Sequence, residues 1–298
     1  MIEKLEYLLA LAQEKHFGRA AEVCAVSQPS LSLGLKQLEE TLGVMLVQRG
    51  SRFIKLTSEG ERTLEWARRI VGDARAMRQD IVTLKNGLTG RLRIAVVPAA
   101  LPMVATVTQP LHLRHPDVQF TILSRPAHDI PLLLDNLEID AAITYVDTEP
   151  TGRNRSIPLY REHYQLLVTT DSTFAEKDKV TWAMVSRMPL CLLTQDTENR
   201  RVMDRLLSDG QEGPVIALES DSMSVLFAHV RTGAWVSIVP DKIAQSTRIG
   251  TKDLKAIPIV EPDAVHTIGL VMPDREPSSA LATALAAEAS RTAAMLLH

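Results

Sequence analysis

The sequence contains little cysteine. Two of its 298 residues are cysteines, Cys24 and Cys191, and they are far apart with no Cys-x-x-Cys pair. A disulfide framework needs more cysteines at closer spacing, so this class of small secreted protein is excluded. We interpret both residues as buried thiols of a protein in a reducing compartment.

Long apolar runs and an export signal are also missing. The short apolar run Tyr7–Ala12 follows Glu3 and Glu6, which is unlike the basic start of a secretory signal. No apolar stretch approaches the ~20 residues that span a bilayer. We therefore expect the chain in the cytoplasm, with no membrane as a partner.

The chain has no excess of basic charge. Its formal net charge is −3, which taken alone argues against a nucleic-acid-binding protein. The first 87 residues differ from the rest, since they carry 13 Lys and Arg against 11 Asp and Glu. Any DNA contact must therefore come from the local placement of charge.

Motifs of common enzymes are absent as well. The sequence contains no Gly-x-Gly-x-x-Gly, no phosphate-loop motif and no Gly-x-Ser-x-Gly. His112 and His115 share a helix face, but no partner motif for a metal lies near them. We expect neither enzymatic activity nor a bound metal or cofactor.

What the first 58 residues do contain is a pattern of short helices. Helical spacing of apolar residues predicts one helix before Gly18 and a second over Arg19–Val26. A third helix follows the turn at Ser27, with Pro29 in its first turn and Gly43 at its end. Its buried face is predicted to consist of Leu31, Leu35, Leu38 and Leu42. Two short strands within residues 44–57 then flank a polar turn and predict a hairpin.

A long helix follows the capping-box pattern Ser58–Glu61 and ends at Asn86-Gly87. Its apolar residues recur in steps of three and four, which favours a dimer seam over packing on its own domain. We expect a hinge at Gly90. The predicted seam residues are Leu64, Ala67, Val71, Ala74, Met77, Ile81 and Leu84.

Residues 91–298 alternate short apolar runs with helical patterns. This alternation predicts an α/β fold with a mostly parallel sheet, large enough for two lobes. Helices are predicted over Met103–Arg114, Ser222–Arg231 and Ser278–Leu297. The predicted strands are Leu92–Val97, Val118–Ser124, Asp140–Tyr145, Tyr164–Thr169, Leu190–Thr194, Val215–Glu219, Trp235–Val239 and Thr267–Met272.

The third helix has the residue types of a DNA-reading helix. A helix, a tight turn and a second helix place a recognition helix in the major groove. The face opposite the leucines carries Gln28, Ser30, Ser32 and Lys36, which suit base edges and phosphates. Arg49 and Arg52 in the hairpin suit backbone or minor-groove contacts. By spacing alone, a solvated helix in an all-α domain is an equal alternative.

An ordered set of motifs in residues 1–60 resembles LysR-type transcriptional regulators. The motifs are Phe17-Gly18-Arg19-Ala20-Ala21, Val26-Ser27-Gln28-Pro29-Ser30-Leu31-Ser32, Lys36-Gln37-Leu38-Glu39, Leu42-Gly43, Arg49 and Leu56-Thr57-x-x-Gly60. The resemblance implies a winged helix-turn-helix over 1–58, a dimerising linker helix over 59–89 and an effector-binding domain over 90–298. That domain resembles periplasmic binding proteins, with lobe I about 90–161 and 268–298 and lobe II about 162–267.

The resemblance also implies partners and DNA-binding residues. Such regulators are homodimers through the linker helix, commonly homotetramers, that bind double-stranded promoter DNA and switch on a small metabolite. Carried over to this sequence, the turn and recognition helix contain Ser27, Gln28, Pro29, Ser30 and Ser32, and the wing contains Arg49 and Arg52.

Three positions depart from the family pattern. Leu46-Val47 stands where Leu-Phe is usual, so we expect altered wing packing, and Cys24 stands where leucine is common. Leu33-Gly34 replaces more polar residues. A glycine inside a helix costs about 1 kcal/mol, which puts base readout near Gly34 in doubt.

Effector residues are expected where strands end, because ligands of open α/β sheets bind there. Arg125 is the best side chain for a carboxylate or phosphate, with a surface ion pair as the alternative, so we expect an anionic effector. The predicted effector residues are Ala99, Ala100, Leu101, Ser124, Arg125, Thr144, Tyr145, Thr194, Gln195 and Ser222.

The segment Tyr145-Val146-Asp147-Thr148-Glu149-Pro150 resembles a subgroup of the family linked to one-carbon and formate metabolism. The effector is therefore predicted to be a small organic acid. The alternative for the chain as a whole is a cytoplasmic solute-binding protein without a role in transcription, which residues 91–298 alone would allow.

Overall fold

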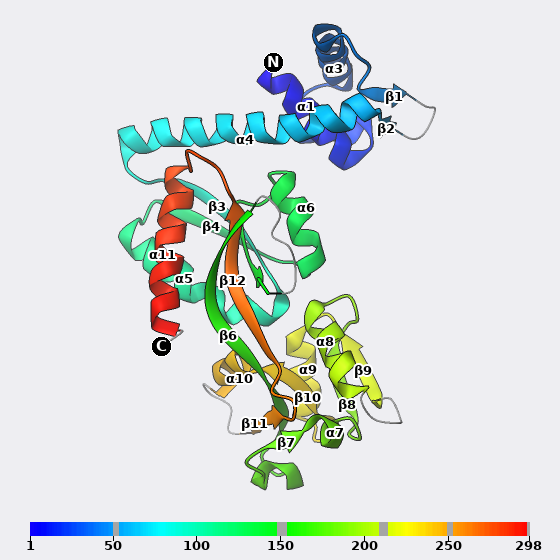
Figure 1. The fold of residues 1–298 in the computed structure, drawn as a ribbon, viewed down its shortest axis with the longest axis vertical. Helices are drawn as coiled ribbons and strands as arrows, with labels where there is room; N and C mark the ends of the chain where they lie inside the picture. The colour runs from blue at the N-terminus through cyan, green and yellow to red at the C-terminus, as the bar shows by residue number, and fades with distance from the viewer. Residues whose placement is uncertain (50–53, 148–153, 209–213, 249–252, 297–298) are drawn as a thin grey trace. The chain divides into compact units, whose positions relative to one another are not determined.

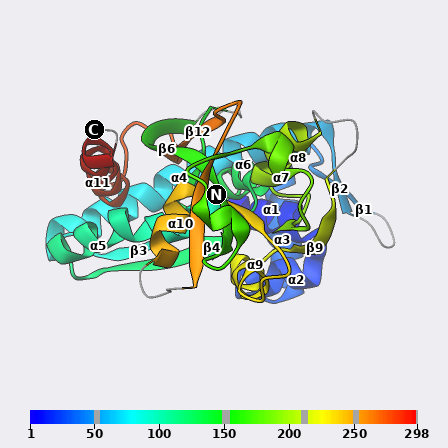
Figure 2. The same cartoon turned by 90° about the horizontal axis from the view of Figure 1, so that it is seen from below.

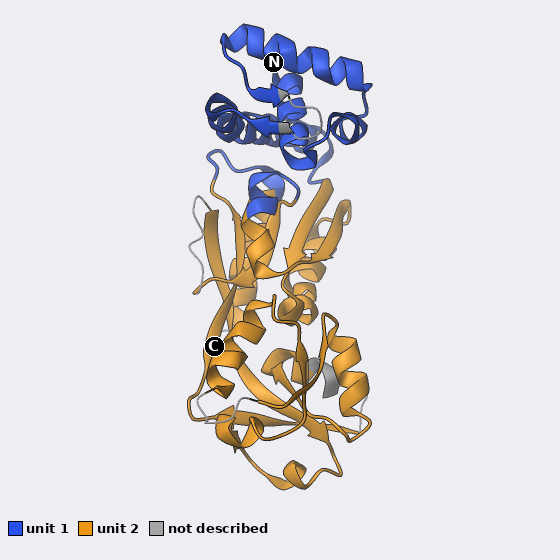
Figure 3. Ribbon diagram, turned by 90° about the vertical axis from the view of Figure 1, so that its right-hand side faces the viewer, with its two compact units in different colours: residues 1–89, 132–138, 275–281 blue, residues 90–131, 139–274, 282–298 orange. Residues whose placement is uncertain are grey.

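The computed structural model describes residues 1–49, 54–147, 154–208, 214–248 and 253–296. The chain divides into two compact units (Figure 3). Unit 1 consists mainly of residues 1–89, and unit 2 mainly of residues 90–298 without the short segments 132–138 and 275–281.

Three helices form the body of unit 1 (Figure 1). They are α1 (Ile2–Glu14), α2 (Phe17–Val23) and α3 (Gln28–Leu42). Each turns its apolar face to a shared core, because apolar residues at helical spacing leave water together. The α3 contribution to that core is Leu31, Leu35 and Leu38, as the leucine pattern predicted, whereas Leu42 is 43% exposed.

Both ends of α3 follow the local chemistry of the sequence. The Ser27 hydroxyl caps the helix by accepting a hydrogen bond from the Ser30 amide, which confirms the predicted N-cap. At the other end Gly43 has a φ of 71°, a left-handed conformation that glycine adopts without strain.

Gly34 allows α3 to pack closely on α1. It is buried on the α1 side of α3, where a Cβ atom would lie 2.7 Å from two ring carbons of Tyr7. This residue therefore faces the core and not the outward face of the helix, and the expected effect on base readout nearby stays a prediction.

The predicted hairpin is present as β1 (Val47–Arg49) and β2 (Ile54–Leu56), which pair antiparallel. The buried Glu39 carboxylate of α3 accepts hydrogen bonds from the Leu46 and Val47 amides, at 2.8 and 3.2 Å. Leu46 and Val47 are both buried, so the smaller valine still packs into the core. Glu39 therefore fixes the hairpin directly to α3.

The long helix α4 spans Ser58–Asn86. Its N-cap is Thr57 rather than Ser58, since the Thr57 hydroxyl accepts from the Gly60 amide and donates to the Met45 carbonyl. A Cβ at Gly60 would lie 2.1 Å from the Leu46 carbonyl oxygen, so only glycine fits this approach.

The predicted dimer seam of α4 is wrong in its first half. Leu64, Ala67 and Val71 are buried in the core of unit 1, because this part of the helix packs on α1. A second stripe, one quarter-turn away, is apolar and exposed. We call it the α4 stripe, and it consists of Trp66, Ile70, Met77, Ile81 and Leu84.

Unit 2 is built on a sheet with the strand order β4-β3-β5-β12-β6-β11-β7, with β10 also paired to β6 and a separate β8-β9 pair. The strands are β3 (Gly90–Val96), β4 (Val118–Ser124), β5 (Ala141–Tyr145), β6 (Asn154–Thr169), β7 (Val180–Thr181), β8 (Leu190–Leu193), β9 (Ile216–Ser220), β10 (Ser237–Pro240), β11 (Leu254–Val260) and β12 (Val265–Pro273). The helices are η1 (Pro98–Val104), α5 (Ala105–Arg114), η2 (Ala127–Asp129), α6 (Ile130–Asp135), η3 (Thr173–Glu176), α7 (Trp182–Val185), α8 (Glu198–Leu207), α9 (Met223–Val230), α10 (Asp241–Arg248) and α11 (Ala280–Leu296).

The sheet is mixed, so the prediction of a mostly parallel sheet is corrected. Strand β3 pairs parallel with β4 and β5, and β8 pairs parallel with β9. The long strands β6 and β12 pair antiparallel with each other and with β5, β10 and β11. The sequence indicated only the second half of β6 and missed β7 and β11. The predicted hinge residue Gly90 is the first residue of β3, paired with Val118.

The described helices of unit 2 cover the sheet on several sides. In Figures 1 and 2, α11 lies beside α5. The Thr292 hydroxyl donates to the Thr106 carbonyl, and Arg114 pairs with the buried Glu288 carboxylate. Within the described ranges, no helix has the length and apolar content needed to cross a membrane. The predicted lobe limits near 161 and 267 fall inside β6 and β12, and the division into lobes stays a prediction.

Candidate nucleic-acid interface and ligand pocket

The outward face of α3 presents polar side chains to solvent. Of the predicted DNA-binding residues, Ser27, Gln28, Pro29, Ser30 and Lys36 are exposed, and Ser32 is half-buried. Lys36 lies 3.9 Å from Glu40, a loose pair between two exposed side chains that leaves the ammonium accessible.

Two of the predicted hydroxyl groups already bond each other. The Ser27 and Ser30 hydroxyl oxygens are 2.8 Å apart at the start of α3. Each hydroxyl has one donor and two acceptor sites, so both retain capacity for a phosphate or a base.

Sequence reasoning missed two outward residues of the same helix. Leu33 is 57% exposed and Gln37 is exposed, and both lie on the face opposite the buried leucines. The leucine period itself was the signal, because every position half a turn from it points outward. Leu33 offers an apolar surface of the kind that contacts a thymine methyl group.

The structure describes only part of the two hairpin arginines. Arg49 is the last residue of β1, but its side chain is outside the described part of the chain, as is the whole of Arg52. Their contact with DNA stays a prediction.

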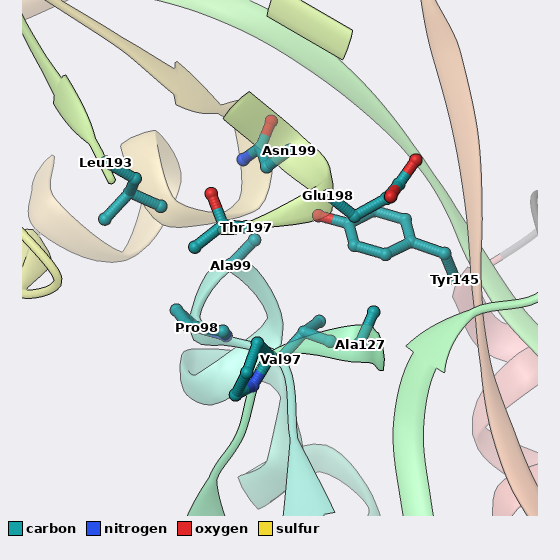
Figure 4. Close-up of a pocket in the computed structure, with 10 residues that line it drawn as sticks. Val97, Pro98, Ala99, Ala127, Tyr145, Leu193, Thr197, Glu198 and Asn199 are labelled. Atoms are coloured by element: carbon teal, nitrogen blue, oxygen red, sulfur yellow. The ribbon is translucent and has the colours of Figure 1, made fainter. Parts of the chain in front are cut away.

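A pocket lies inside unit 2 and is partly open to solvent. One side comes from the chain after β3, the segment before η2 and the end of β5, and the other from the end of β8 and the start of α8 (Figure 4). The lining residues are Val97, Pro98, Ala99, Pro126, Ala127, Tyr145, Leu193, Thr197, Glu198 and Asn199.

The pocket contains two of the ten predicted effector residues, Ala99 and Tyr145. The positions were expected at strand ends, and the pocket does lie at the ends of β3, β5 and β8. Eight residues are outside its lining: Ala100, Leu101, Ser124, Arg125, Thr144, Thr194, Gln195 and Ser222.

Arg125 has another partner. Its guanidinium donates a hydrogen bond to the carbonyl of the preceding residue, Ser124, at 2.7 Å. This bond uses one of the five guanidinium N–H donors, and Arg125 is outside the pocket lining, so its role in holding an effector carboxylate stays a prediction.

Sequence reasoning missed the start of α8. The Thr197 hydroxyl accepts from the Arg200 amide and donates to the Thr194 carbonyl, which places Glu198 and Asn199 in the first turn. Threonine followed by glutamate directly after a buried strand is a helix-start pattern, so this signal was available.

Several polar atoms at the pocket have no protein partner. The Tyr145 hydroxyl and both side-chain atoms of the Asn199 amide are buried without a hydrogen bond from the described residues. Burial, followed by the negative charge of Glu162, raises the pKa of Tyr145 well above its ordinary value, so this phenol is neutral and can donate. Buried polar groups without partners are rare, and a ligand or water that completes them explains their retention.

The described residues offer no site for a metal. Among residues 1–49, 54–147, 154–208, 214–248 and 253–296, no group of His, Cys, Asp and Glu side chains is placed to hold an ion.

Two family descriptions match the chain. "Bacterial regulatory helix-turn-helix protein, lysR family" matches residues 2–61, and "LysR substrate binding domain" matches residues 85–294. The first match contains α1 to α3 and the hairpin, and the second contains the pocket.

Characterised relatives are similar over nearly the whole length. The hydrogen peroxide-inducible genes activator of Dickeya chrysanthemi is 28% identical over 272 residues, which is 91% of this chain and 88% of the relative. The DNA-binding transcriptional dual regulator OxyR of Escherichia coli strain K12 is 27% identical over 271 residues, which is again 91% of this chain and 88% of the relative.

Solved structures share the fold. A full-length OxyR from Pseudomonas aeruginosa has a TM-score of 0.75 at 24% identity and covers 99% of this chain and 95% of that chain. CbnR, a LysR family transcriptional regulator, has a TM-score of 0.62 at 20% identity, with 98% and 99% covered. At these identities the likeness concerns the fold alone.

A helix-turn-helix unit joined to an α/β unit with an interior pocket defines a DNA-binding transcriptional regulator with a substrate-binding type of domain. The chain belongs to the LysR family of bacterial regulatory helix-turn-helix proteins. Members of this family are regulators of transcription and not enzymes. The alternative of a solute-binding protein without a role in transcription is not favoured, because the helix-turn-helix match covers residues 2–61.

Proposed function

We propose that this regulator reads promoter DNA with the outward face of α3 in the major groove. The observation that carries the proposal is the division of α3 into a buried leucine face and an outward face with Gln28, Ser32 and Lys36. Gln28 suits adenine, Ser32 a base or phosphate, and Lys36 the phosphate backbone. The exposed residues Leu33 and Gln37 join this surface.

Two copies of the chain bind through α4 in this proposal. The α4 stripe is exposed and apolar over nearly the whole helix, and its spacing of four, seven, four and three residues is that of a coiled-coil seam. A dimer presents two copies of α3 to two half-sites of an operator, and a pair of dimers gives the homotetramer.

The pocket of unit 2 binds the effector in this proposal. A ligand that bridges the β3 side and the α8 side favours one arrangement of the unit over another, which is how a bound metabolite shifts a conformational equilibrium. The expectation of an anion finds no support in the lining, which contains no Lys or Arg. The formate-linked prediction has no support either, and residues 148–150 of its motif are outside the described residues.

Peroxide sensing, which the names of several relatives suggest, is the second candidate. The thiolate is the reactive form of cysteine. Cys191 is fully buried, and burial raises the pKa of its thiol to about 11, while burial also raises the pKa of Cys24. We therefore propose that the protein responds to a bound ligand rather than to peroxide through a cysteine.

We expect the double variant with Cys24→Ser and Cys191→Ser to bind DNA as the parent does. Hydrogen peroxide should leave the DNA binding of both proteins unchanged. Promoter binding by gel shift before and after peroxide treatment measures this. Loss of the parent's binding on oxidation, absent in the double variant, would restore the peroxide candidate.

The test of DNA recognition is a gel shift with the DNA upstream of the chain's own gene. Gln28→Ala should relax the sequence preference and cost about 1–3 kcal/mol of binding free energy at its base. Lys36→Ala should weaken binding to all sequences and lower the salt slope by about one. Arg49→Ala tests the predicted hairpin contact in the same assay.

Lys179→Ala is the matched control, because it removes the same charge from an exposed position in unit 2. Equal weakening by Lys36→Ala and Lys179→Ala would contradict recognition through α3. So would binding that stays constant between low and moderate salt.

A further inference from the structure

The charged residue that lines the pocket is a carboxylate. Among the ten lining residues, Glu198 is the one with a carboxyl group and none is a Lys, Arg or His, and the Glu198 side chain is 12% exposed. Its described partner is Arg201, at 3.5 Å, whose side chain is half exposed and is not part of the lining. Solvent screens such an outer pair strongly, so the lining keeps its negative character.

Arg200, next to Asn199 in α8, already pairs with two carboxylates. Arg200 is fully buried, and it donates to Asp204 at 2.6 Å and to Glu219 at 2.6 Å. It also donates to the Leu193 carbonyl at 2.7 Å, which ties α8 to β8. This guanidinium therefore pairs with two carboxylates through Nε and Nη1, while its Nη2 is buried without a hydrogen bond to the described residues, and Arg200 is not part of the pocket lining.

A second carboxylate lies on the sheet next to Tyr145. Directly opposed residues of antiparallel strands share a face, and so do residues two apart on one strand. Ile268 of β12 opposes both Tyr145 of β5 and Tyr160 of β6, while His266 opposes Glu162. One face of the sheet thus carries Tyr145, Tyr160, Glu162, Tyr164 and His266.

The polar atoms of this face lack partners. Both carboxylate oxygens of Glu162 and the hydroxyls of Tyr145, Tyr160 and Tyr164 are buried without a hydrogen bond from the described residues. The His266 ring packs edge-on against two of these rings, 5.8 Å from Tyr145 and 6.1 Å from Tyr164 between centroids. Tyr145 belongs both to this face and to the pocket, and Figure 4 shows its ring pointing toward the start of α8.

We propose that the pocket binds a small organic cation, an amine or a guanidine, held between Glu198 and Tyr145 with Glu162 as a second carboxylate. Carboxylates take the N–H donors of a cation in charge-assisted hydrogen bonds, and tyrosine rings attract the charge through their π faces. The Asn199 amide oxygen accepts a further N–H.

An anion fits this environment poorly. Besides Glu198 and Glu162, the carboxylates of Asp147 and Asp241 are near enough to act on Glu162. Within the lining itself an anionic ligand would meet the Glu198 carboxylate and no Lys or Arg, so like-charge repulsion opposes its binding. The inference reverses the sign of charge expected from the sequence.

The titration of Glu162 supplies a signature for the binding event. Burial, followed by the charges of Asp241 and Asp147, raises the pKa of Glu162 to about 8, so the apo protein holds a proton there at neutral pH. A bound cation favours the ionised form, and that proton is released. Affinity should therefore rise with pH up to about 8 and then level off.

The experiment uses the full chain and probes of matched size. Calorimetric titration with butylammonium, putrescine and agmatine tests cations, and butyramide and butyrate test the neutral and anionic counterparts. We expect the cations to bind, with proton release that changes with buffer ionisation heat, and butyrate to give no heat of binding. Glu198→Gln should lower the affinity for the cationic probes by at least about tenfold. Glu162→Gln should abolish the proton release.

Glu176→Gln is the control, since it removes an exposed carboxylate elsewhere in unit 2 and should leave binding unchanged. Tyr145→Phe tests the same site if a charge variant fails to fold. Binding of butyrate in place of the cations, or no binding of any cationic probe, would overturn the inference.

The inference rests on the proposed function in that the pocket is the effector site. The promoter gel shift without ligand separates the two proposals. Loss of DNA recognition there defeats the proposed function, whereas DNA binding without cation binding defeats only the inference.

Discussion

At the scale of single residues, the buried carboxylate of Glu39 shows how one side chain joins two elements. Its oxygen accepts from the amides of Leu46 and Val47, which begin the hairpin, while its backbone belongs to α3. The two amides are buried, so loss of the acceptor leaves donors without partners. The recognition helix and the hairpin are thereby held in one geometry.

We expect Glu39→Ala to lower the free energy of unfolding of the DNA-binding unit by about 2–4 kcal/mol, from two unsatisfied buried amides. Glu39→Gln keeps an acceptor oxygen and should cost less. Urea unfolding measures both, with Glu40→Ala, one residue away and exposed, as the control. A cost for Glu39→Ala no larger than that of Glu40→Ala would contradict this role.

Gly34 is required by contact rather than by backbone conformation. The space for its Cβ is taken by the ring of Tyr7, which is itself buried and cannot move aside freely. Helix propensity alone predicts that alanine stabilises this position by about 1 kcal/mol, so the two effects have opposite sign.

We expect Gly34→Ala to destabilise the fold by about 1–3 kcal/mol, because overpacking outweighs propensity. Thermal unfolding of Gly34→Ala measures the effect, and the second change Tyr7→Leu should recover part of the loss. A higher melting temperature for Gly34→Ala alone would contradict this prediction, because it would show that the Tyr7 ring can move aside at little cost.

At the scale of elements, α4 has two apolar faces, of which one is buried and the other is exposed. Leu64, Ala67 and Val71 complete the core of unit 1, whereas the α4 stripe is exposed. Large exposed apolar side chains in a continuous row are unusual on a monomer and mark an interface. The helix thus packs on its own domain with one face, and the other face is the one that the proposed second copy would cover.

The double variant Met77→Glu and Leu84→Glu should convert the proposed α4 dimer to a monomer, because like charges would meet across a desolvated seam. Sedimentation equilibrium measures the change in mass. Val82→Glu is the matched control, since Val82 is 41% exposed but lies on the other side of the helix. Dissociation by Val82→Glu alone, with the double variant still dimeric, would place the interface elsewhere.

At the scale of the whole molecule, the buried charge of Glu162 links stability to pH. The groups around it are the carboxylates of Asp147 and Asp241, the His266 ring and three tyrosines. Its pKa is raised from 4.5 to about 8 on folding. The folded state therefore holds a proton that the unfolded state has released, and this group's contribution to stability falls as pH rises from about 4.5 to about 8.

We expect Glu162→Gln to remove this loss of stability with rising pH. The variant should match the parent near pH 5 and exceed it increasingly up to about pH 8, by about 3–5 kcal/mol at 1.36 kcal/mol per pKa unit. Unfolding in urea across this range measures the difference. A difference between the two proteins that stays constant with pH would contradict the raised pKa.

The sequence by itself determined the local elements and the identity of the family. The leucine spacing of α3, the cap at Ser27 and the end at Gly43 depend on residues close in sequence, so the chain's own residue order is enough to predict them. The strand Val118–Ser124 was predicted at its observed limits for the same reason, as a short apolar run between turns. Motif order in residues 1–60 pointed to the LysR family.

Only the tertiary structure decided which apolar face of α4 is buried, how the strands pair and what lines the pocket. Each depends on residues far apart in sequence: β6 and β12 pair across about a hundred residues, and the pocket joins Ala99 to Asn199. The pocket lies at strand ends, but which of their side chains face it is set by packing between elements. That Glu198 and the buried Tyr145 line one pocket emerges only in the folded chain, because proximity and burial are properties of the assembled site.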